Sequence, residues 1–239
     1  MAKFALITGA SGGIGRKTAE LLARNGWNLY LHYYINKKEM DDLVKELSNY
    51  PVEVIPIQAD LTGAAGANQL TESIFGIDAV VHASGVSKWG LFQDHSESDM
   101  DDLWNIHVKS PMIIIQKLLE KLIRARGKIV IVSSIWGQTG AACEVLYSTV
   151  KGAQLSFVKS FSKEIARNGV RINAIAPGAV NTGMLNSFTE EELEDVKEDI
   201  PMGRLANSEE IASAIRFLLS DEASYITGQV LAVNGGWYT

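Results

Sequence analysis

A glycine-rich turn after the first apolar segment is the feature that most limits the folds open to this chain. Phe4–Thr8 is apolar and β-prone, and Thr8–Gly15 then reads TGASGGIG before a helical pattern that runs to Arg24. Glycines let a backbone turn sharply and approach a ligand closely, and the start of a helix offers unpaired N–H groups. Strand, glycine turn and helix in this order predict the first unit of a dinucleotide-binding α/β fold. The same turn can also serve only to pack a helix against a strand.

Short apolar segments alternate with stretches of helical periodicity along the whole chain. The expected strands are Phe4–Thr8, Leu29–Tyr33, Val54–Ile57, Ala79–Ala83, Ile129–Val132, Ile172–Ala176 and Val230–Val233. Strands separated by helices pair in parallel through right-handed crossovers, and continuous apolar strands are covered on both faces. The 239 residues suit one large domain. We therefore predict a single domain, residues 1–239, with a Rossmann-type doubly wound parallel sheet of seven strands and helices on both faces.

Helix boundaries carry their own signals. Arg24-Asn-Gly26 is typical of a helix C-terminus, and Thr189-x-x-Glu192 and Asn207-x-x-Glu210 have the spacing of capping boxes. The acidic stretch Glu190–Asp199 contains a single lysine. Its composition favours a solvated helix face, while its position after the sixth strand also suits a lid.

The composition disfavours several function classes. A net charge of −6 gives no overall basic surface for nucleic acid or an anionic membrane. Cys143 is the only cysteine, which excludes an intrachain disulfide and fits a reducing compartment, and the histidines show no spacing typical of metal ligands. Because the first strand begins almost at Met1 and no apolar run could cross a bilayer, we expect a cytoplasmic protein without membrane contact.

The end of the second strand bears on the choice of cofactor. An acid there would hold the adenosine ribose hydroxyls and repel a 2′-phosphate, but the segment His32–Lys38 contains no carboxylate. Asn36, Lys37 and Lys38 can instead supply donors and positive charge, which favours NADP. The alternative is that these lysines only start a solvated helix, and Gly12 stands where a basic residue would have strengthened the prediction.

Tyr147 and Lys151 lie four residues apart, so on a helix they project from one face. A phenol titrates near pH 10, and a nearby ammonium lowers that pKa toward the working range of an acid-base catalyst. Ser134, at the end of the fifth strand, can bind a substrate carbonyl there, with Ser133 as the alternative. Pro177–Thr182 follows the sixth strand and can hold a ligand amide or form an ordinary turn.

Together these pieces resemble the short-chain dehydrogenase/reductase family along essentially the whole chain. The resemblance rests on Thr8–Gly15, Asp60, Ser134, Tyr147 with Lys151, Asn173, Pro177–Gly178, Tyr225–Gln229 and Asn234–Gly236. It implies an NADPH-dependent reduction of a ketone in which Tyr147 protonates the oxygen, Ser134 orients it, and Lys151 anchors the nicotinamide ribose and lowers the Tyr147 pKa. It also implies a homo-oligomer, usually a homotetramer.

The same resemblance implies which residues hold the cofactor, with Asp60 near the adenine and Thr182 near the carboxamide. The full implied set is Gly9, Ser11, Gly13, Ile14, Gly15, Tyr33, Tyr34, Asn36, Lys37, Asp60, Leu61, Ser84, Gly85, Tyr147, Lys151, Pro177, Gly178, Val180 and Thr182.

Two positions depart from the family pattern. His82-Ala83-Ser84-Gly85 replaces the usual Asn-Asn-Ala-Gly and keeps the glycine of close approach. His107 replaces the helix asparagine that supports the proton relay, and Asn105 would lie about 200° away around a regular helix. We predict that His107 is a catalytic residue that holds the relay water, with purely structural packing as the alternative.

Within the family, Ile200–Leu205 and the Asn234–Tyr238 tail resemble 3-oxoacyl-[acyl-carrier-protein] reductases, which implies a carrier-attached ketone and acyl carrier protein as a partner. Ser134–Gly140 and Glu144–Tyr147 resemble the branch that reduces 5-aminopentanone on a lysine of elongation factor P. Both substrates stay open at this point.

Three side chains are candidates for substrate binding. Glu144 can pair with a substrate ammonium or remain an exposed carboxylate at a helix start, and Trp89 and Trp136 can line a pocket or pack as ordinary aromatics. A hypothesis of another class is a non-catalytic NADP-binding sensor or scaffold on the same fold, since a fold does not guarantee chemistry.

Overall fold

In the computed structural model, which describes residues 3–185 and 188–239, the strands form one parallel sheet in the order β3-β2-β1-β4-β5-β6-β7. The strands are β1 (Lys3–Thr8), β2 (Trp27–Tyr33), β3 (Val54–Gln58), β4 (Ala79–His82), β5 (Lys128–Val132), β6 (Arg171–Pro177) and β7 (Val230–Val233). All seven predicted strands are confirmed, with ends displaced by at most two residues. The order reverses between β1 and β4, which is where open α/β sheets bind ligands.

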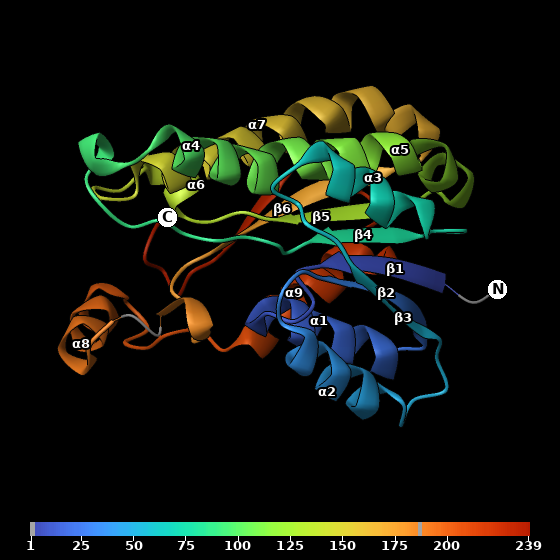
Figure 1. The fold of residues 1–239 in the computed structure, drawn as a ribbon, viewed down its shortest axis with the longest axis horizontal. Helices are drawn as coiled ribbons and strands as arrows, with labels where there is room; N and C mark the ends of the chain where they lie inside the picture. Colours follow the sequence, from blue (N-terminus) through green and yellow to red (C-terminus); the bar gives the residue numbers. More distant parts are fainter. Residues whose placement is uncertain (1–2, 186–187) are drawn as a thin grey trace.

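Helices cover both faces of this sheet (Figure 1). One face carries α3 (Ala64–Glu72), α5 (Ser110–Ala125) and α7 (Val145–Ile165), and the other carries α1 (Gly13–Arg24), α2 (Lys37–Leu47) and α9 (Ser208–Leu219). At the carboxyl ends of the strands lie α4 (Glu97–Trp104), α6 (Trp136–Thr139) and α8 (Glu190–Asp199). Short 3₁₀ segments are η1 (Phe92–Asp94), η3 (Ala166–Asn168), η4 (Gly183–Leu185) and η5 (Asp221–Ala223). Within the described ranges, no helix has the length and apolarity needed to cross a membrane.

The core has two halves because successive strand residues point to opposite faces. Ala5 and Ile7 of β1 are fully buried against α1, α2 and α9, whereas Leu6 between them is buried against α3, α5 and α7. Burial on both faces explains why the strands appear in the sequence as unbroken apolar runs.

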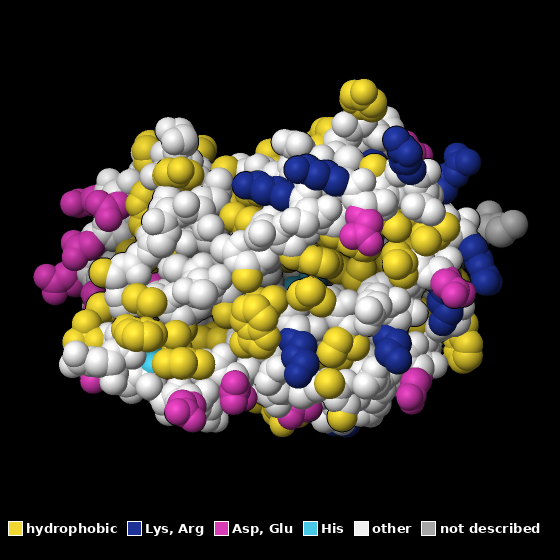
Figure 2. Space-filling view, turned by 90° about the horizontal axis from the view of Figure 1, so that it is seen from above, with side chains coloured by type: hydrophobic (Ala, Val, Ile, Leu, Met, Phe, Trp, Pro, Cys, Tyr) yellow, Lys and Arg dark blue, Asp and Glu magenta, His cyan; other side chains and the backbone are white. Residues whose placement is uncertain are grey.

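The predicted helix boundaries are confirmed. Helix α1 ends at Arg24, and Gly26 follows with a φ of 76°. Both capping boxes form, at Thr189 with Glu192 and at Asn207 with Glu210. Helix α8 has no buried residue, and it lies beyond the carboxyl ends of the strands (Figure 1). Its carboxylates colour one end of the molecule in Figure 2, as expected for a solvated helix.

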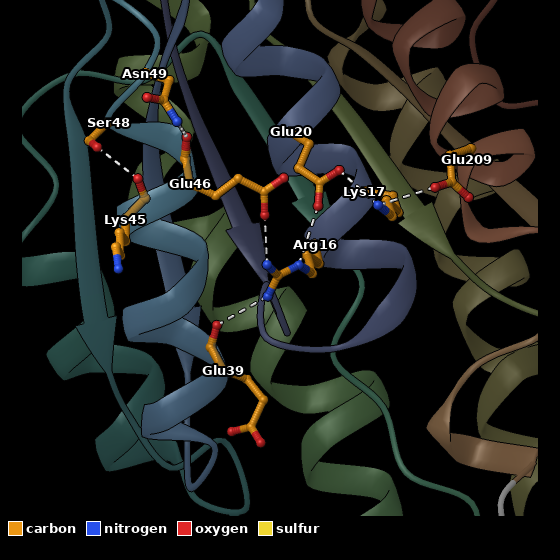
Figure 3. A network of polar contacts seen from close by, with 9 residues as sticks. All are labelled: Arg16, Lys17, Glu20, Glu39, Lys45, Glu46, Ser48, Asn49 and Glu209. Atoms are coloured by element: carbon orange, nitrogen blue, oxygen red, sulfur yellow. Dashed lines mark hydrogen bonds and ion pairs between the residues drawn. The ribbon is translucent and has the colours of Figure 1, made fainter.

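Two cations in the first turn of α1 connect this helix to its neighbours (Figure 3). Arg16 pairs with Glu46 of α2 at 2.7 Å and with Glu20 at 3.2 Å. Lys17 pairs with Glu20 at 2.9 Å and with Glu209 of α9 at 3.2 Å. Glu20 is buried, whereas Glu46 and Glu209 are exposed, so the single pairs to α2 and α9 contribute little stability, but together they tie α1 to both helices.

Helices α4 and α5 are one continuous helix interrupted by a π-helical segment, η2 (Asn105–Lys109). Here Ser110 N–H donates to the carbonyl of Asn105, five residues back. Pro111 follows at the start of α5 and has no N–H to give. The carbonyls of Ile106 and His107 therefore lack the backbone N–H donor that any other residue at position 111 would offer. Such π segments often mark functional sites.

Candidate active site

The glycine turn after β1 comes as close to β4 as the backbone permits. Gly9 has a φ of 67°, and a Cβ on it would lie 2.8 Å from backbone atoms of Ser84. A Cβ on Gly15 would lie 2.2 Å from the carbonyl oxygen of Gly9. Only glycine satisfies both positions, so the sequence motif has a steric cause here.

The start of α1 fits a pyrophosphate. Its N-cap is Gly12, which has no side chain to occupy the first N–H groups of the helix. Thr182, from the loop after β6, lies against Gly13. The loop predicted to meet the far end of the cofactor therefore borders the turn predicted to hold its phosphates.

The adenosine end differs in one detail from the sequence prediction. Lys37 Nζ lies 2.7 Å from Asp41 Oδ2, so its charge is already paired on the surface of α2. Tyr34 lies next to Asp60, whose carboxylate raises the pKa of the Tyr34 phenol. Asp60 Oδ1 itself accepts from Thr62 N–H at 2.9 Å, which turns this acid at the end of β3 toward its own loop.

Two buried histidines, at the ends of β2 and β4, form hydrogen bonds that connect neighbouring strand ends near the glycine turn. His32 Nδ1 accepts from Gly9 N–H at 3.1 Å, and its Nε2 lies 3.1 Å from the carbonyl of Ala59. Burial lowers the pKa of His32 to about 4. His82 Nδ1 bonds Thr8 Oγ1 at 2.9 Å, and burial, followed by the charge of Lys151, lowers its pKa to about 3. Both rings are neutral at pH 7.

Tyr147 and Lys151 lie on α7 as predicted, with Lys151 Nζ 5.3 Å from the Tyr147 ring centroid. The direction of the Tyr147 pKa differs from the prediction. Burial raises it well above that of a free phenol, the charge of Glu144 raises it further, and a hydrogen bond with Ser134 only partly opposes this. Burial also lowers the Lys151 pKa to about 7, so part of its population is uncharged at neutral pH. The prediction from helix spacing therefore assumed too large an effect of this charge on the Tyr147 pKa. Tyr147 is protonated at neutral pH, which is the form of a proton donor.

The two serines after β5 have different tasks. Ser133 Oγ donates to the carbonyl of Lys151 at 3.0 Å and holds the backbone of α7. Ser134 lies beside Tyr147, and its Oγ accepts from Trp136 N–H at 3.1 Å. Both follow Val132, the last residue of β5, rather than end the strand. Ser134 is thus the serine placed to share a substrate oxygen with Tyr147.

His107 is fully buried in the π segment, and its ring meets the Tyr147 ring edge-on with centroids 5.6 Å apart. Its Nε2 lies 2.8 Å from the Val86 carbonyl oxygen and 3.2 Å from Val86 N, so the ring can donate to the carbonyl or accept from the N–H, depending on its tautomer. Burial, and then the charge of Lys151, lower the pKa of His107 well below its usual value. The ring is therefore neutral beside the catalytic pair.

The three candidate substrate residues differ in how the fold holds them. Glu144 is the N-cap of α7 rather than a helix residue, and its carboxylate oxygens accept from Ser87 Oγ at 3.0 and 3.2 Å. Trp136 contacts Trp237 with ring centroids 5.1 Å apart, while Trp89 is 72% exposed. Of the two tryptophans, Trp136 alone is held by an aromatic partner among the described residues.

Comparison with known proteins identifies the family. A family model described as Enoyl-(Acyl carrier protein) reductase matches residues 9–238. The chain belongs to the short-chain dehydrogenase/reductase family. It is 53% identical to an uncharacterized oxidoreductase, YmfI, of Bacillus subtilis over 241 residues, covering 100% of both chains. It is 36% identical to the 3-oxoacyl-[acyl-carrier-protein] reductase FabG of Aquifex aeolicus over 242 residues, covering 99% of this chain and 97% of the relative.

A solved member of similar fold is the angucycline C-6 ketoreductase LanV with bound NADP. It superimposes with a TM-score of 0.93 at 26% identity, covering 98% of this chain and 95% of that one. The short-chain dehydrogenase/reductase fold expected from the motifs is confirmed.

Sequence reasoning missed three residues of this short-chain reductase site. Gln154 donates from Nε2 to the His107 carbonyl at 2.7 Å, and Ser87 holds Glu144. Gln154 had a signal, because it follows Lys151 by three residues on the same helix face. Pro111 also had one, because a proline four residues after His107 removes the donor for its carbonyl. Ser87 had no signal, since it lies 57 residues from Glu144 in sequence.

Proposed function

We propose that this chain is an NADPH-dependent ketone reductase whose substrate is a 3-oxoacyl-[acyl-carrier-protein] or a similar carrier-attached ketone. The observation that carries the proposal is the meeting of Ser134, Tyr147 and Lys151 at the sheet edge where Gly9 and α1 form a phosphate cradle. The cofactor of LanV and the FabG relative support NADP and the acyl substrate, respectively.

The side chains divide the work of reduction. When bound, the cofactor supplies a hydride to the ketone carbon. Tyr147 Oη gives its proton to the ketone oxygen, and Ser134 donates a hydrogen bond to the same oxygen as negative charge develops there. Lys151 gives one N–H to the Val132 carbonyl at 2.8 Å and keeps two others for the ribose hydroxyls.

The first experiment measures NADPH oxidation by the purified protein with an acetoacetyl carrier thioester and with a small β-ketoester. We expect turnover in the wild type and its loss in Tyr147→Phe, with unchanged NADPH binding. NADPH binding without turnover on any ketone would favour a sensor or scaffold instead. Oxidation that persists in Tyr147→Phe would contradict the assigned proton donor.

A second candidate substrate is 5-aminopentanone attached to a lysine of elongation factor P, and Glu144 is the observation that favours it. The carboxylate is half-buried, and burial raises its pKa, with Ser87 and His95 opposing. No lysine or arginine pairs with Glu144 among the ion pairs of the described residues. A half-buried carboxylate that accepts from only one hydroxyl has room for a further partner, and a substrate ammonium would supply the opposite charge.

The two substrates can be separated by comparing the acetoacetyl carrier thioester with aminopentanone-modified elongation factor P. If Glu144 binds the ammonium, Glu144→Gln raises KM for the cationic substrate at least about tenfold and leaves KM for the thioester unchanged. Glu164→Gln is the matched control, since it removes the same charge from an exposed position near the other end of α7. An unchanged KM for the cationic substrate in Glu144→Gln would remove the case for it.

We further propose a cytoplasmic homo-oligomer, as the family resemblance implies. Apolar side chains are visible among the cations of the face in Figure 2. Phe157 and Phe161 of α7 stack with ring centroids 5.4 Å apart and remain partly exposed. Light scattering with Phe157→Glu tests this, because a monomer in the variant and a larger species in the wild type are expected.

A further inference from the structure

A tight turn after β7 fixes the position of Trp237. Asn234 is only 9% exposed, and its side chain closes the turn, with Nδ2 donating to the Tyr238 carbonyl at 2.7 Å and Oδ1 accepting from Gly236 N–H at 3.0 Å. Trp237 N–H donates to the Asn234 carbonyl at 3.1 Å. Because the backbone on both sides of Trp237 is bonded to Asn234, the indole leaves this turn, residues 234–238, from a fixed backbone.

The Asn234 turn lies against the loop after β6. Gly178 N–H donates to the Val233 carbonyl at 3.1 Å, and a Cβ on Gly178 would lie 3.0 Å from Asn234 Cα. A side chain at position 178 would therefore press on the turn, and glycine permits the close approach. This loop is the one predicted to hold the nicotinamide carboxamide, so the turn borders the reactive end of the predicted cofactor site.

Trp237 connects this turn to the loop that carries Ser134. Its ring meets the Trp136 ring with centroids 5.1 Å apart and planes inclined by 66°. Trp136 N–H donates to Ser134 Oγ at 3.1 Å. Two successive contacts thus join Trp237 to the hydroxyl assigned to the ketone oxygen. In Figure 1 the C-terminus lies beside α6 at the carboxyl ends of the strands, in agreement with this contact.

The backbone of Trp136 is held from the other side by α7. Trp136 begins α6, and a Cβ on the next residue, Gly137, would lie 2.7 Å from the Lys151 carbonyl carbon. Helix α6 therefore packs directly on the turn of α7 that bears the catalytic lysine. Both indoles remain partly exposed although they contact each other. Aromatic side chains held in this way are typical of the walls of small-molecule pockets.

We propose that Trp237 and Trp136 form one wall of the substrate pocket beside Ser134, and that Trp237 is a specificity-determining residue for the apolar substituent of the ketone. This role rests on the ketone-reducing function proposed above. Because Trp237 is held by the Asn234 turn and by Trp136, it presents a fixed apolar surface along which a hydrocarbon chain can lie. Each methylene that packs on such a surface improves binding about fourfold, so the wall favours longer acyl chains.

The test measures kcat and KM at saturating NADPH with N-acetylcysteamine thioesters from acetoacetyl to 3-oxooctanoyl. In the wild type, KM should fall about fourfold with each added methylene. In Trp237→Ala, KM for the 3-oxooctanoyl thioester should rise at least about tenfold, while kcat and KM for the acetoacetyl thioester stay within about twofold. Trp237→Phe keeps an aromatic surface and should restore part of the dependence. Phe75→Ala is the matched control, because it removes an exposed ring at the amino ends of the strands.

A purely structural role gives a different pattern. If Trp237 only supports the fold, kcat falls or KM rises by the same factor for every chain length, and either result overturns the proposal, as does a wild-type KM that ignores chain length. Should Trp237→Ala fail to fold, Trp136→Ala should remove the same dependence.

The double variant Trp136→Ala with Trp237→Ala tests whether the two rings act together. It should be no worse than either single variant, because each change already breaks the wall. Effects that add in the double variant would overturn the proposal. A wild type that oxidises no NADPH with any ketone would instead reject the proposed function on which this role rests.

Discussion

A Cβ atom on Gly13 would lie 2.7 Å from Thr182 Cγ2, so these two residues set how closely α1 approaches the loop after β6. Gly13→Ala should therefore push Thr182 aside and weaken NADPH binding about tenfold, the effect of a modest overpacking. The Kd from NADPH fluorescence checks this.

The double variant Gly13→Ala with Thr182→Ser makes this prediction specific. Serine lacks Cγ2 and keeps the hydroxyl, so affinity should recover in part, since Ser208 Oγ at 3.0 Å and the Cβ of residue 182 at 3.2 Å would remain close to the new Cβ. Gly12→Ala is the control, because its Cβ would meet only the Gly9 carbonyl at 3.4 Å, an ordinary contact. Recovery that fails to appear would mean that the contact with Thr182 does not limit binding.

Burial of Lys151 makes a pH dependence expected near neutrality. Its pKa in the folded protein, about 7, lies below the usual 10.5, so the ammonium is present below pH 7 and is lost above it. Since kcat/KM for NADPH reports groups of the free enzyme, it should fall as pH rises through about 7. Lys151→Arg stays charged, so its kcat/KM should be lower but should lack this decline. The same decline in the arginine variant would assign the titration to another group.

His32 should make the fold sensitive to acid. Its pKa falls from 6.5 in the unfolded chain to about 4 in the folded protein. Between pH 6.5 and pH 4 the unfolded state therefore binds a proton that the folded state does not bind. The free energy of unfolding should therefore fall as pH drops from 6.5 to 4, with about 3 kcal/mol attributable to His32.

Urea denaturation at several pH values measures this contribution. His32→Asn keeps an acceptor for Gly9 N–H but does not titrate, so its stability should decline less over the same range. Parallel declines in variant and wild type would show that His32 is not the sensor.

The adjacent serines should separate chemistry from stability. Ser134→Ala should lower kcat about 100-fold, as for loss of one donor to a developing oxyanion. Ser133→Ala should cost about 1 kcal/mol of stability, because the Lys151 carbonyl loses a buried hydrogen bond, and should change kcat only a few-fold. Steady-state kinetics and thermal melts of both variants check this, and the reverse pattern would exchange the two roles.

Much of the fold could be predicted because strands that are buried on both faces appear in the sequence as unbroken apolar runs. Strand β6 is buried throughout, and even Asn173 within it is satisfied by the Ile226 carbonyl and by Gln229 N–H. The strong local signals of glycine turns and capping boxes placed the helix ends. Helix periodicity placed Tyr147 and Lys151 on one face, and it was their combination with Ser134, the glycine turn and the family resemblance that singled them out.

The rest depended on contacts between distant segments or on burial that no spacing encodes. The raised Tyr147 pKa reflects desolvation by the surrounding fold, which outweighs one neighbouring charge. The pairing of Lys37 with Asp41 could be predicted from their i,i+4 spacing. Whether the paired lysine can still bind a 2′-phosphate of the cofactor depends on the geometry of the surface, which the spacing does not encode. Gln154 and His107 lie 47 residues apart and meet only because Pro111 opens a carbonyl between them.

The π segment Asn105–Lys109 holds one residue more than the same length of regular α-helix would need. Removing one residue there would let Glu97–Ala125 become a single straight helix without lengthening any loop. Because the extra residue is taken up within the segment, α4 and α5 would keep their orientation, and only the residues of the segment, His107 among them, would change the direction in which they point. One inserted residue thus makes the histidine's place in this site a matter of chain length, which a single-codon deletion could reverse.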